Sequence, residues 1–212
     1  MAINPKDGKK TFFATYDASD DRAGWNVDAI VGTIAAKFRG DRVILAADCC
    51  YSGALVDRVK RAHGRQSFAC FASSTSKDSS TANWTFTEML LAGLQGRSFA
   101  DLNGDRRVTL GEIARGVHDD MRFAEDQTSA SVFTGGFNTE TLIATAHPRS
   151  DAAIGRRVEV KSDGDWYKAR IIDAKNRQFR VHYFGYEVAD DEWVGPSALR
   201  RTGQRQRAER SR

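Results

Sequence analysis

Two adjacent cysteines, Cys49 and Cys50, stand where an apolar run ends. Residues 43–47 predict a buried strand, and the letters "DCCYSG" that follow predict a turn into a helix. A helix N-terminus stabilises a thiolate, and backbone N–H groups at such a turn can stabilise an oxyanion. The pattern therefore indicates a nucleophile presented at the end of a strand. The alternative is packing, because a free cysteine is also a small buried apolar residue.

Alternating strand and helix patterns surround this stretch. Residues 25–38 carry apolar side chains three and four positions apart, which predicts an amphipathic helix, and residues 11–19 predict a strand before it. Strand, helix and strand in this order predict a crossover unit with a parallel sheet. Further strands are expected at 67–74, 130–137 and 141–146, and further helices at 54–64, 85–96 and 109–124. The fold class expected for residues 1–147 is therefore α/β.

The segment "AADCCYSGAL" resembles the Asp-x-Cys-x-Ser-Gly nucleophile motif of caspase-like cysteine peptidases, particularly metacaspase-like and bacterial members. "TFFATYDAS" and "FRGDRV" upstream, and "FASSTSKDSSTANWTFTEMLLAGLQG" and "ADLNGDRRVTLGEIARGV" downstream, are similar in the same order. The resemblance covers residues 11–147 and implies a caspase-like layered sheet with flanking helices. It also implies a cysteine-type endopeptidase acting on a protein or peptide. Cys50 would be the catalytic nucleophile, Cys49 the intervening residue, and Asp48 the carboxylate that binds a basic residue before the scissile bond.

The catalytic base is what this resemblance lacks. The family has a His-Gly pair at the end of the strand before "TFFATYDAS", and residues 1–10 contain no histidine. The four histidines of the chain all follow Cys50 in sequence: His63, His118, His147 and His182. The His63-Gly64 pair is on the wrong side of the nucleophile and is more simply a helix end. Two interpretations stay open: the C-terminal part of a longer peptidase whose histidine strand is absent, or a non-catalytic pseudo-peptidase scaffold.

Residues 101–112, "DLNGDRRVTLGE", carry oxygen ligands at positions 1, 3, 5 and 12 of a calcium-loop pattern. These candidate metal ligands are Asp101, Asn103, Asp105 and Glu112. Position 6 of the pattern is Gly, and here it is Arg106. The sequence favours the alternative, a turn with Asp and Asn caps followed by a capping box from Thr109 to Glu112. No cofactor is expected to be required, and Ca²⁺ is the candidate metal.

From residue 155 onward the pattern changes to short alternating strands, after a linker at residues 148–154. "DWYKARII", "FRVHYFGY" and "DDEWV" resemble the Tudor, chromo-barrel and agenet group, which implies a small SH3-like all-β barrel at residues 155–200. Many of its members hold a methylated lysine or arginine in an aromatic cage, which implies a protein ligand. The candidate cage residues are Trp166, Tyr167, Tyr183, Tyr186 and Trp193. Trp166 and Tyr183 are equally suited to the barrel core.

The net charge of +4 comes from the C-terminal end of the chain. Residues 200–212 carry six arginines and one glutamate, so we expect a disordered basic tail at 201–212 without specific nucleic-acid binding. The three cysteines cannot all pair, and neighbouring cysteines bridge only with strain, which predicts free thiols. With no signal segment and no apolar run of about 18 residues, a cytoplasmic protein without a membrane partner is expected.

Overall fold

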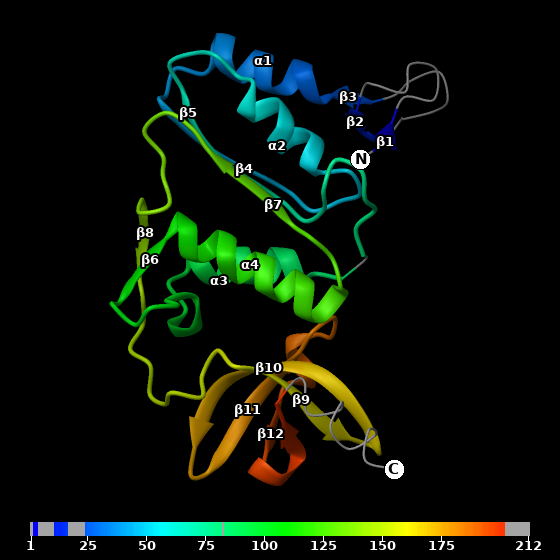
Figure 1. Ribbon diagram of the computed structural model, residues 1–212, viewed down its shortest axis with the longest axis vertical. Helices are drawn as coiled ribbons and strands as arrows, with labels where there is room; N and C mark the ends of the chain where they lie inside the picture. The colour runs from blue at the N-terminus through cyan, green and yellow to red at the C-terminus, as the bar shows by residue number, and fades with distance from the viewer. Residues whose placement is uncertain (1, 4–10, 17–23, 82, 202–212) are drawn as a thin grey trace, which may run out of the picture.

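The computed structural model describes residues 2–3, 11–16, 24–81 and 83–201, and it combines a mixed α/β part with a C-terminal five-strand antiparallel half-barrel (Figure 1). The helices are α1 Val27–Lys37, α2 Gly53–Lys60, α3 Thr85–Leu94 and α4 Leu110–Glu125. The strands of the α/β part are β1 Ala2–Ile3, β2 Thr11–Phe13, β3 Trp25–Asn26, β4 Arg42–Ala47, β5 Ser67–Ala72, β6 Arg107–Thr109, β7 Ala130–Phe133 and β8 Leu142–Thr145. The half-barrel strands are β9 Arg157–Ser162, β10 Asp165–Lys175, β11 Gln178–Tyr183, β12 Glu192–Val194 and β13 Leu199–Arg200. Short 3₁₀ turns are η1 Ser98–Ala100, η2 Val188–Asp190 and η3 Pro196–Ala198.

A three-stranded sheet in the order β4-β5-β7 forms the centre of the α/β part. β4 and β5 are parallel and are joined through α2, whereas β7 runs antiparallel to β5. Alternate side chains of β5 point to opposite faces: Phe68 and Cys70 pack with α1 and α2, and Ala69 and Phe71 pack with α3 and α4. The sheet therefore lies between two helix layers, and Figure 1 shows the half-barrel below the layer of α3 and α4.

The amphipathic pattern of residues 25–38 is confirmed as α1. Val27, Ile30 and Val31 are buried, which is the face that the three- and four-residue spacing predicts. The side chain of Asn26 accepts a hydrogen bond from the Ala29 N–H and caps the first turn. The helix predicted at 54–64 is confirmed as α2, but it ends at Lys60, so Gly64 does not close it.

The strand predicted at residues 11–19 does not join the central sheet. β2 pairs antiparallel with β1 and β3 in a separate small sheet, and residues 17–19 lie outside the described ranges. The predicted parallel crossover from this strand to β4 is therefore wrong. The side chain of Phe13 finds its apolar contacts against the α1–α2 cluster instead. Within the described residues, β4 pairs with β5 alone, and Ile44 on β4 is 45% exposed.

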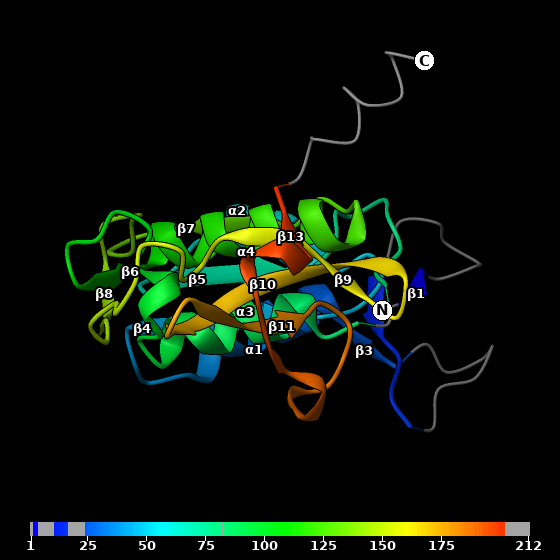
Figure 2. The same cartoon turned by 90° about the horizontal axis from the view of Figure 1, so that it is seen from below.

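The half-barrel is a single sheet in the order β12-β11-β10-β9-β13. Its long central strand, β10, changes register between Ile171 and Asp173, and this bulge bends the strand so that the sheet curls. The concave side encloses a separate apolar cluster in which Val160 and Val181 are fully buried. Seen from below, β10 and β11 lie across α3 and α4 (Figure 2).

Three expectations concern the chain as a whole. Within the described ranges, every helix is too short or too polar to span a bilayer. All three cysteines are free thiols, as their number and spacing predicted. The predicted basic tail lies, except for Arg201, outside the residues that the structure describes.

Candidate functional site

Cys50 lies in the turn between β4 and α2, where the sequence placed it. The N–H of Ser80 donates a hydrogen bond to Cys50 Sγ at 3.3 Å, and the thiol points to the carbonyl oxygen of Ser80 at 3.8 Å. Ser80 belongs to the polar loop between β5 and α3. A backbone N–H directed at the sulfur stabilises a thiolate, so this contact suits a nucleophile as well as a buried thiol.

The serine and glycine of the "DCCYSG" turn have structural roles. Ser52 is fully buried: its N–H donates to Ser74 Oγ at 3.1 Å, and its own Oγ accepts from the Ser74 N–H at 3.1 Å. Ser74 Oγ also donates to the Cys49 carbonyl oxygen at 3.0 Å. A Cβ on Gly53 would lie 2.5 Å from the Ser76 nitrogen, so only glycine fits there. These contacts fasten the turn to the loop that carries Ser80.

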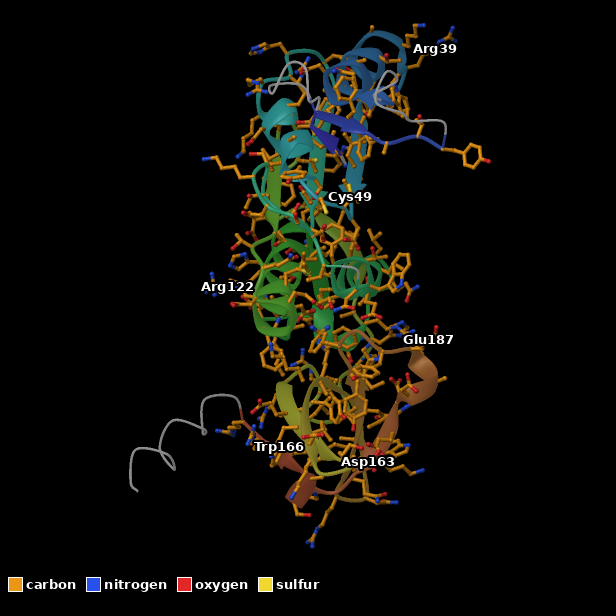
Figure 3. The ribbon with its side chains drawn as sticks, turned by 90° about the vertical axis from the view of Figure 1, so that its right-hand side faces the viewer. Arg39, Cys49, Arg122, Asp163, Trp166 and Glu187 are labelled. Atoms are coloured by element: carbon orange, nitrogen blue, oxygen red, sulfur yellow. The ribbon has the colours of Figure 1, made fainter. Side chains whose placement is uncertain are left out.

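Cys49 and Cys50 have different surroundings. The Cys49 side chain packs against the apolar cluster of α1 and α2, as the packing alternative for these cysteines predicts. Tyr51 then takes a left-handed backbone conformation, with φ of 59°, and its N–H donates to the Asp78 carbonyl oxygen at 2.8 Å. Figure 3 places Cys49 in the α/β part, far from Trp166 and Asp163 in the half-barrel.

Asp48 is oriented by helix α3. Its Oδ2 accepts a hydrogen bond from Thr87 Oγ1 at 2.7 Å. The carboxylate is partly exposed, and its Oδ1 accepts no hydrogen bond from any residue in the described ranges. A carboxylate held by one oxygen and open at the other is suited to a guanidinium or ammonium group. The structure thus brings Asp48 and Cys50 to the same end of β4.

No histidine in the described part of the chain bonds Cys50, the candidate nucleophile. All four histidines are among the described residues, and none forms a hydrogen bond with Cys50. His63 is exposed and lies beyond the end of α2 opposite to Cys50. His182 is engaged at the half-barrel, where it bonds Glu88 and Asp191. The site therefore contains a thiol and a carboxylate but no imidazole.

The loop at residues 101–112 is held by hydrogen bonds to its own backbone. Asp101, a buried residue, accepts from the N–H groups of Gly104 and Arg106 at 2.7 and 2.9 Å. Glu112 accepts from Leu102 N–H at 2.9 Å and closes the capping box with Thr109 at the start of α4. Among the described residues, no group of three or more His, Cys, Asp or Glu side chains is placed to hold a metal ion. Both the Asp caps and the capping box are present, and Ca²⁺ binding stays a prediction.

At position 6 the loop differs from the calcium-loop pattern in residue type but not in backbone conformation. Arg106 has a φ of 66°, in the left-handed region that glycine adopts most easily. The loop therefore keeps the chain reversal that the pattern assigns to glycine.

Three of the five candidate cage residues come together on the half-barrel. The rings of Tyr167, Tyr183 and Tyr186 meet edge to face in pairs, with centroids 5.9–6.1 Å apart. Tyr183 also belongs to the apolar core and donates its hydroxyl to Glu192, and burial, followed by this hydrogen bond, raises its pKa. Tyr186 is 48% exposed, so it forms the accessible side of the cluster.

The two tryptophans lie elsewhere. The Arg200 guanidinium lies over the Trp166 ring, 3.9 Å from its centroid, so this ring already holds a cation. Trp193 stands opposite Arg180 in the β11–β12 pair and is 42% exposed. Neither ring contacts the tyrosine cluster in the described part of the chain.

A second polar group, which the sequence did not reveal, joins the half-barrel to the α/β part. The fully buried Asp120 on α4 bonds Arg157 Nε at 2.7 Å and also pairs with Arg170 on β10. The Arg170 guanidinium lies between two rings, 4.7 Å from the centroid of Phe99 and 5.3 Å from that of Phe184. A cleft of about 510 Å³ opens beside Arg170, between α3 and the half-barrel. Its residues are far apart in sequence, so no local motif could indicate it.

Comparison with known proteins adds no family. No protein-family model matches the chain, and no curated protein matches it. The assignment of function therefore rests on the geometry of the site and on the residues that form it.

Proposed function

We propose that the α/β part is a caspase-like cysteine-type endopeptidase that cleaves after basic residues. Cys50 is its nucleophile, Asp48 is its substrate-binding carboxylate, and the half-barrel is an SH3-like module of the Tudor group. The observation that carries the proposal is the Cys50 thiol at the end of β4, with the Ser80 nitrogen 3.3 Å from its sulfur and the partly exposed Asp48 at the same end of the strand. A substrate arginine or lysine pairs with Asp48 and brings its own carbonyl carbon, which belongs to the scissile bond, to the sulfur.

The reaction requires a base. The Cys50 thiol gives its proton to the base, and the sulfur attacks the carbonyl carbon. The amine leaves with that proton, and water then hydrolyses the thioester. The described residues bring no histidine to Cys50, so the proposal includes a base from a further strand at the open edge of β4. The pairing of β4 supports this position: among the described residues β4 pairs with β5 alone, and an unpaired edge accepts another strand.

The test uses the 212-residue chain and a small external base. Hydrolysis of a fluorogenic peptide ending in Arg is measured at increasing imidazole concentration. We expect a slow rate that rises with imidazole, is abolished by Cys50→Ala and persists in the matched variant Cys49→Ala. A peptide ending in Asp is expected to stay uncleaved. Equal rates in the two cysteine variants, or equal cleavage of the two peptides, would contradict the proposal.

A pseudo-peptidase scaffold is the second candidate, and the absence of any histidine at Cys50 among the described residues favours it. In this case the half-barrel binds a partner and the α/β part only supports it. Tyr167, Tyr183 and Tyr186 then form the binding cluster for a methylated lysine or arginine of a protein ligand. No concentration of imidazole would restore hydrolysis.

The binding function is tested with a trimethyllysine peptide and the same peptide carrying unmodified lysine. A ring over a cation contributes about 0.5–2 kcal/mol, so Tyr186→Ala is expected to weaken binding roughly 2- to 30-fold. Trp193→Ala is the matched control, because Trp193 is similarly exposed but lies outside the cluster. Equal affinity for the two peptides would exclude a methyl-cation site.

A further inference from the structure

His182 on β11 lies at the boundary between the half-barrel and α3, with a carboxylate at each ring nitrogen. Its Nδ1 is 2.7 Å from Asp191 Oδ1, within the half-barrel. Its Nε2 is 3.2 Å from Glu88 Oε2, on α3 of the α/β part. One imidazole therefore joins the two parts of the molecule directly.

Both contacts can be hydrogen bonds only when the ring is protonated. An imidazolium has two N–H donors, whereas neutral imidazole has one donor and one lone pair. A carboxylate offers acceptors only, so a neutral ring must turn a lone pair toward one of the two. Loss of the proton therefore converts one attractive contact into a repulsive one.

The surroundings decide which contact is lost. The Asp191 side chain is 2% exposed and also pairs with Arg180 at 3.4 Å, whereas the Glu88 side chain is 35% exposed. A donor withdrawn from the more buried carboxylate costs more free energy, so the neutral ring keeps its proton on Nδ1 toward Asp191. The Nε2 lone pair then faces Glu88. Deprotonation therefore breaks the hydrogen bond between His182 and Glu88, which is one of the bonds that cross between the two parts.

Other charged groups near His182 are paired or lie at the cleft. Arg170 is the cross-strand neighbour of His182 and is neutralised by Asp120. Further titratable or charged side chains line the same cleft: Arg97, His147, Asp173 and Arg180. Only Glu88 and Asp191, among the described residues, bond the imidazole itself. The hydrogen bond that the His182 ring donates to Glu88 is the largest cause that raises the pKa of His182, burial lowers it, and the hydrogen bond to Asp191 raises it again.

The rest of the interface does not depend on this proton. Asp120 pairs with Arg157 and Arg170 on the α4 side, and Lys168 Nζ donates to the Ala124 carbonyl oxygen at 3.0 Å. These contacts attach the half-barrel to α4 without involving the imidazole. The proton on His182 thus acts on the α3 side, where the cleft of about 510 Å³ is located and where Arg170 Nη1 also donates to Met89 Sδ at 3.2 Å.

We propose that His182 is a proton-controlled latch between the half-barrel and α3, closed when the imidazole is charged and released when it is neutral. Release loosens one wall of the cleft while the half-barrel stays attached to α4. The latch does not depend on the proposed peptidase activity, although α3 also carries Thr87, which orients Asp48.

The direction of the pH dependence follows from the raised pKa. A group whose pKa is higher in the docked state stabilises docking fully below its ordinary value of 6.5, and this contribution is lost as pH rises through the raised value. Each unit of the rise corresponds to about a tenfold change in the docking equilibrium. We therefore expect α3 to be better protected at pH 6 than at pH 8.5.

Two measurements test the latch. In long-range ¹H–¹⁵N spectra of the labelled chain, we expect His182 to titrate above 6.5 and its neutral ring to carry the proton on Nδ1. In hydrogen exchange corrected for intrinsic rates, we expect α3 amides to lose protection between pH 6 and pH 8.5, with α2 as the internal reference.

Glu88→Gln is the test variant. The substitution removes the carboxylate charge, and the glutamine amide can donate a hydrogen bond to Nε2 of a neutral His182. We expect the pKa of His182 to fall and the loss of α3 protection at high pH to disappear. Asp119→Asn, which removes an exposed carboxylate from α4, is the matched control and is expected to behave as wild type. A neutral ring protonated on Nε2, or α3 protection that is equal at both pH values in wild type, would overturn the proposal.

Discussion

At the scale of single residues, the three cysteines show how strongly position changes one chemical group. Cys70 is fully buried in the middle of β5, and burial raises the pKa of its thiol to about 12. Cys50 is partly exposed at the end of β4, with a backbone N–H beside its sulfur. A thiol reacts as its thiolate. We therefore expect Cys50 to be much more reactive than Cys70.

Alkylation of the native protein tests this difference. With iodoacetamide at pH 8, we expect Cys50 to be modified and Cys70 to stay unmodified until the chain is unfolded. Peptide mass spectrometry measures the extent at each cysteine, and a urea-unfolded sample provides the control in which all three react. Native Cys70 modified as fast as Cys50 would show that β5 is not the closed centre of the sheet.

At the scale of elements, the sequence predicts those helices and strands that are determined by residues close together in the chain. The helix α1 follows from the spacing of Val27, Ile30 and Val31, which all lie within two turns. The partner of β2 does not follow, because an extended pattern indicates a strand but not which strand it pairs with. The same limit applies to the contact between His182 and Glu88, which are 94 positions apart.

The candidate site was predictable to the same degree. The turn that carries Cys50 follows from a local motif, and the structure has it between β4 and α2. The contacts that hold it come from Ser74 and Ser80 in a loop more than twenty positions away, and no spacing rule indicates them. Only the folded structure shows that Ser74 and Ser80 lie against the turn that carries Cys50.

The loop at residues 101–112 offers a prediction about a single backbone position. Arg106 is in the left-handed region, which costs a non-glycine residue about 1 kcal/mol, so we expect Arg106→Gly to stabilise the protein by about that amount. The melting temperature should rise by roughly 2–4 °C for a chain of this length. Arg107→Gly, one residue later in strand β6, is the control and is expected to destabilise.

Measurements with and without Ca²⁺ distinguish two explanations for a stabilisation by Arg106→Gly: relief of backbone strain and metal binding. Relief of backbone strain predicts the same stabilisation by Arg106→Gly with and without Ca²⁺. A gain seen only with Ca²⁺, and lost on Glu112→Gln, would show that the loop is a metal site. No gain in either condition would contradict the strain at Arg106.

At the scale of the whole molecule, buried charge decides how the half-barrel and the α/β part stay together. Asp120 is fully buried and serves two arginines of the half-barrel, Arg157 and Arg170. Both cations lose water in the interface, and Arg170 is also enclosed by Phe99 and Phe184. Such a pair adds little over an apolar contact, but removal of one partner leaves the other charge buried and unpaired.

The neighbouring aspartates of α4 provide the final prediction, because they differ in burial and not in chemistry. Asp120→Asn removes the shared carboxylate charge from two arginines and is expected to cost about 3–5 kcal/mol, with a fall in melting temperature of roughly 2–4 °C per kcal/mol. Asp119 is 41% exposed and lies 3.8 Å from Arg157, so Asp119→Asn is expected to cost no more than about 0.5 kcal/mol. Calorimetry measures both variants. Equal losses would mean that the half-barrel is held by its apolar contacts with α4, and that Asp120 only fills space between them.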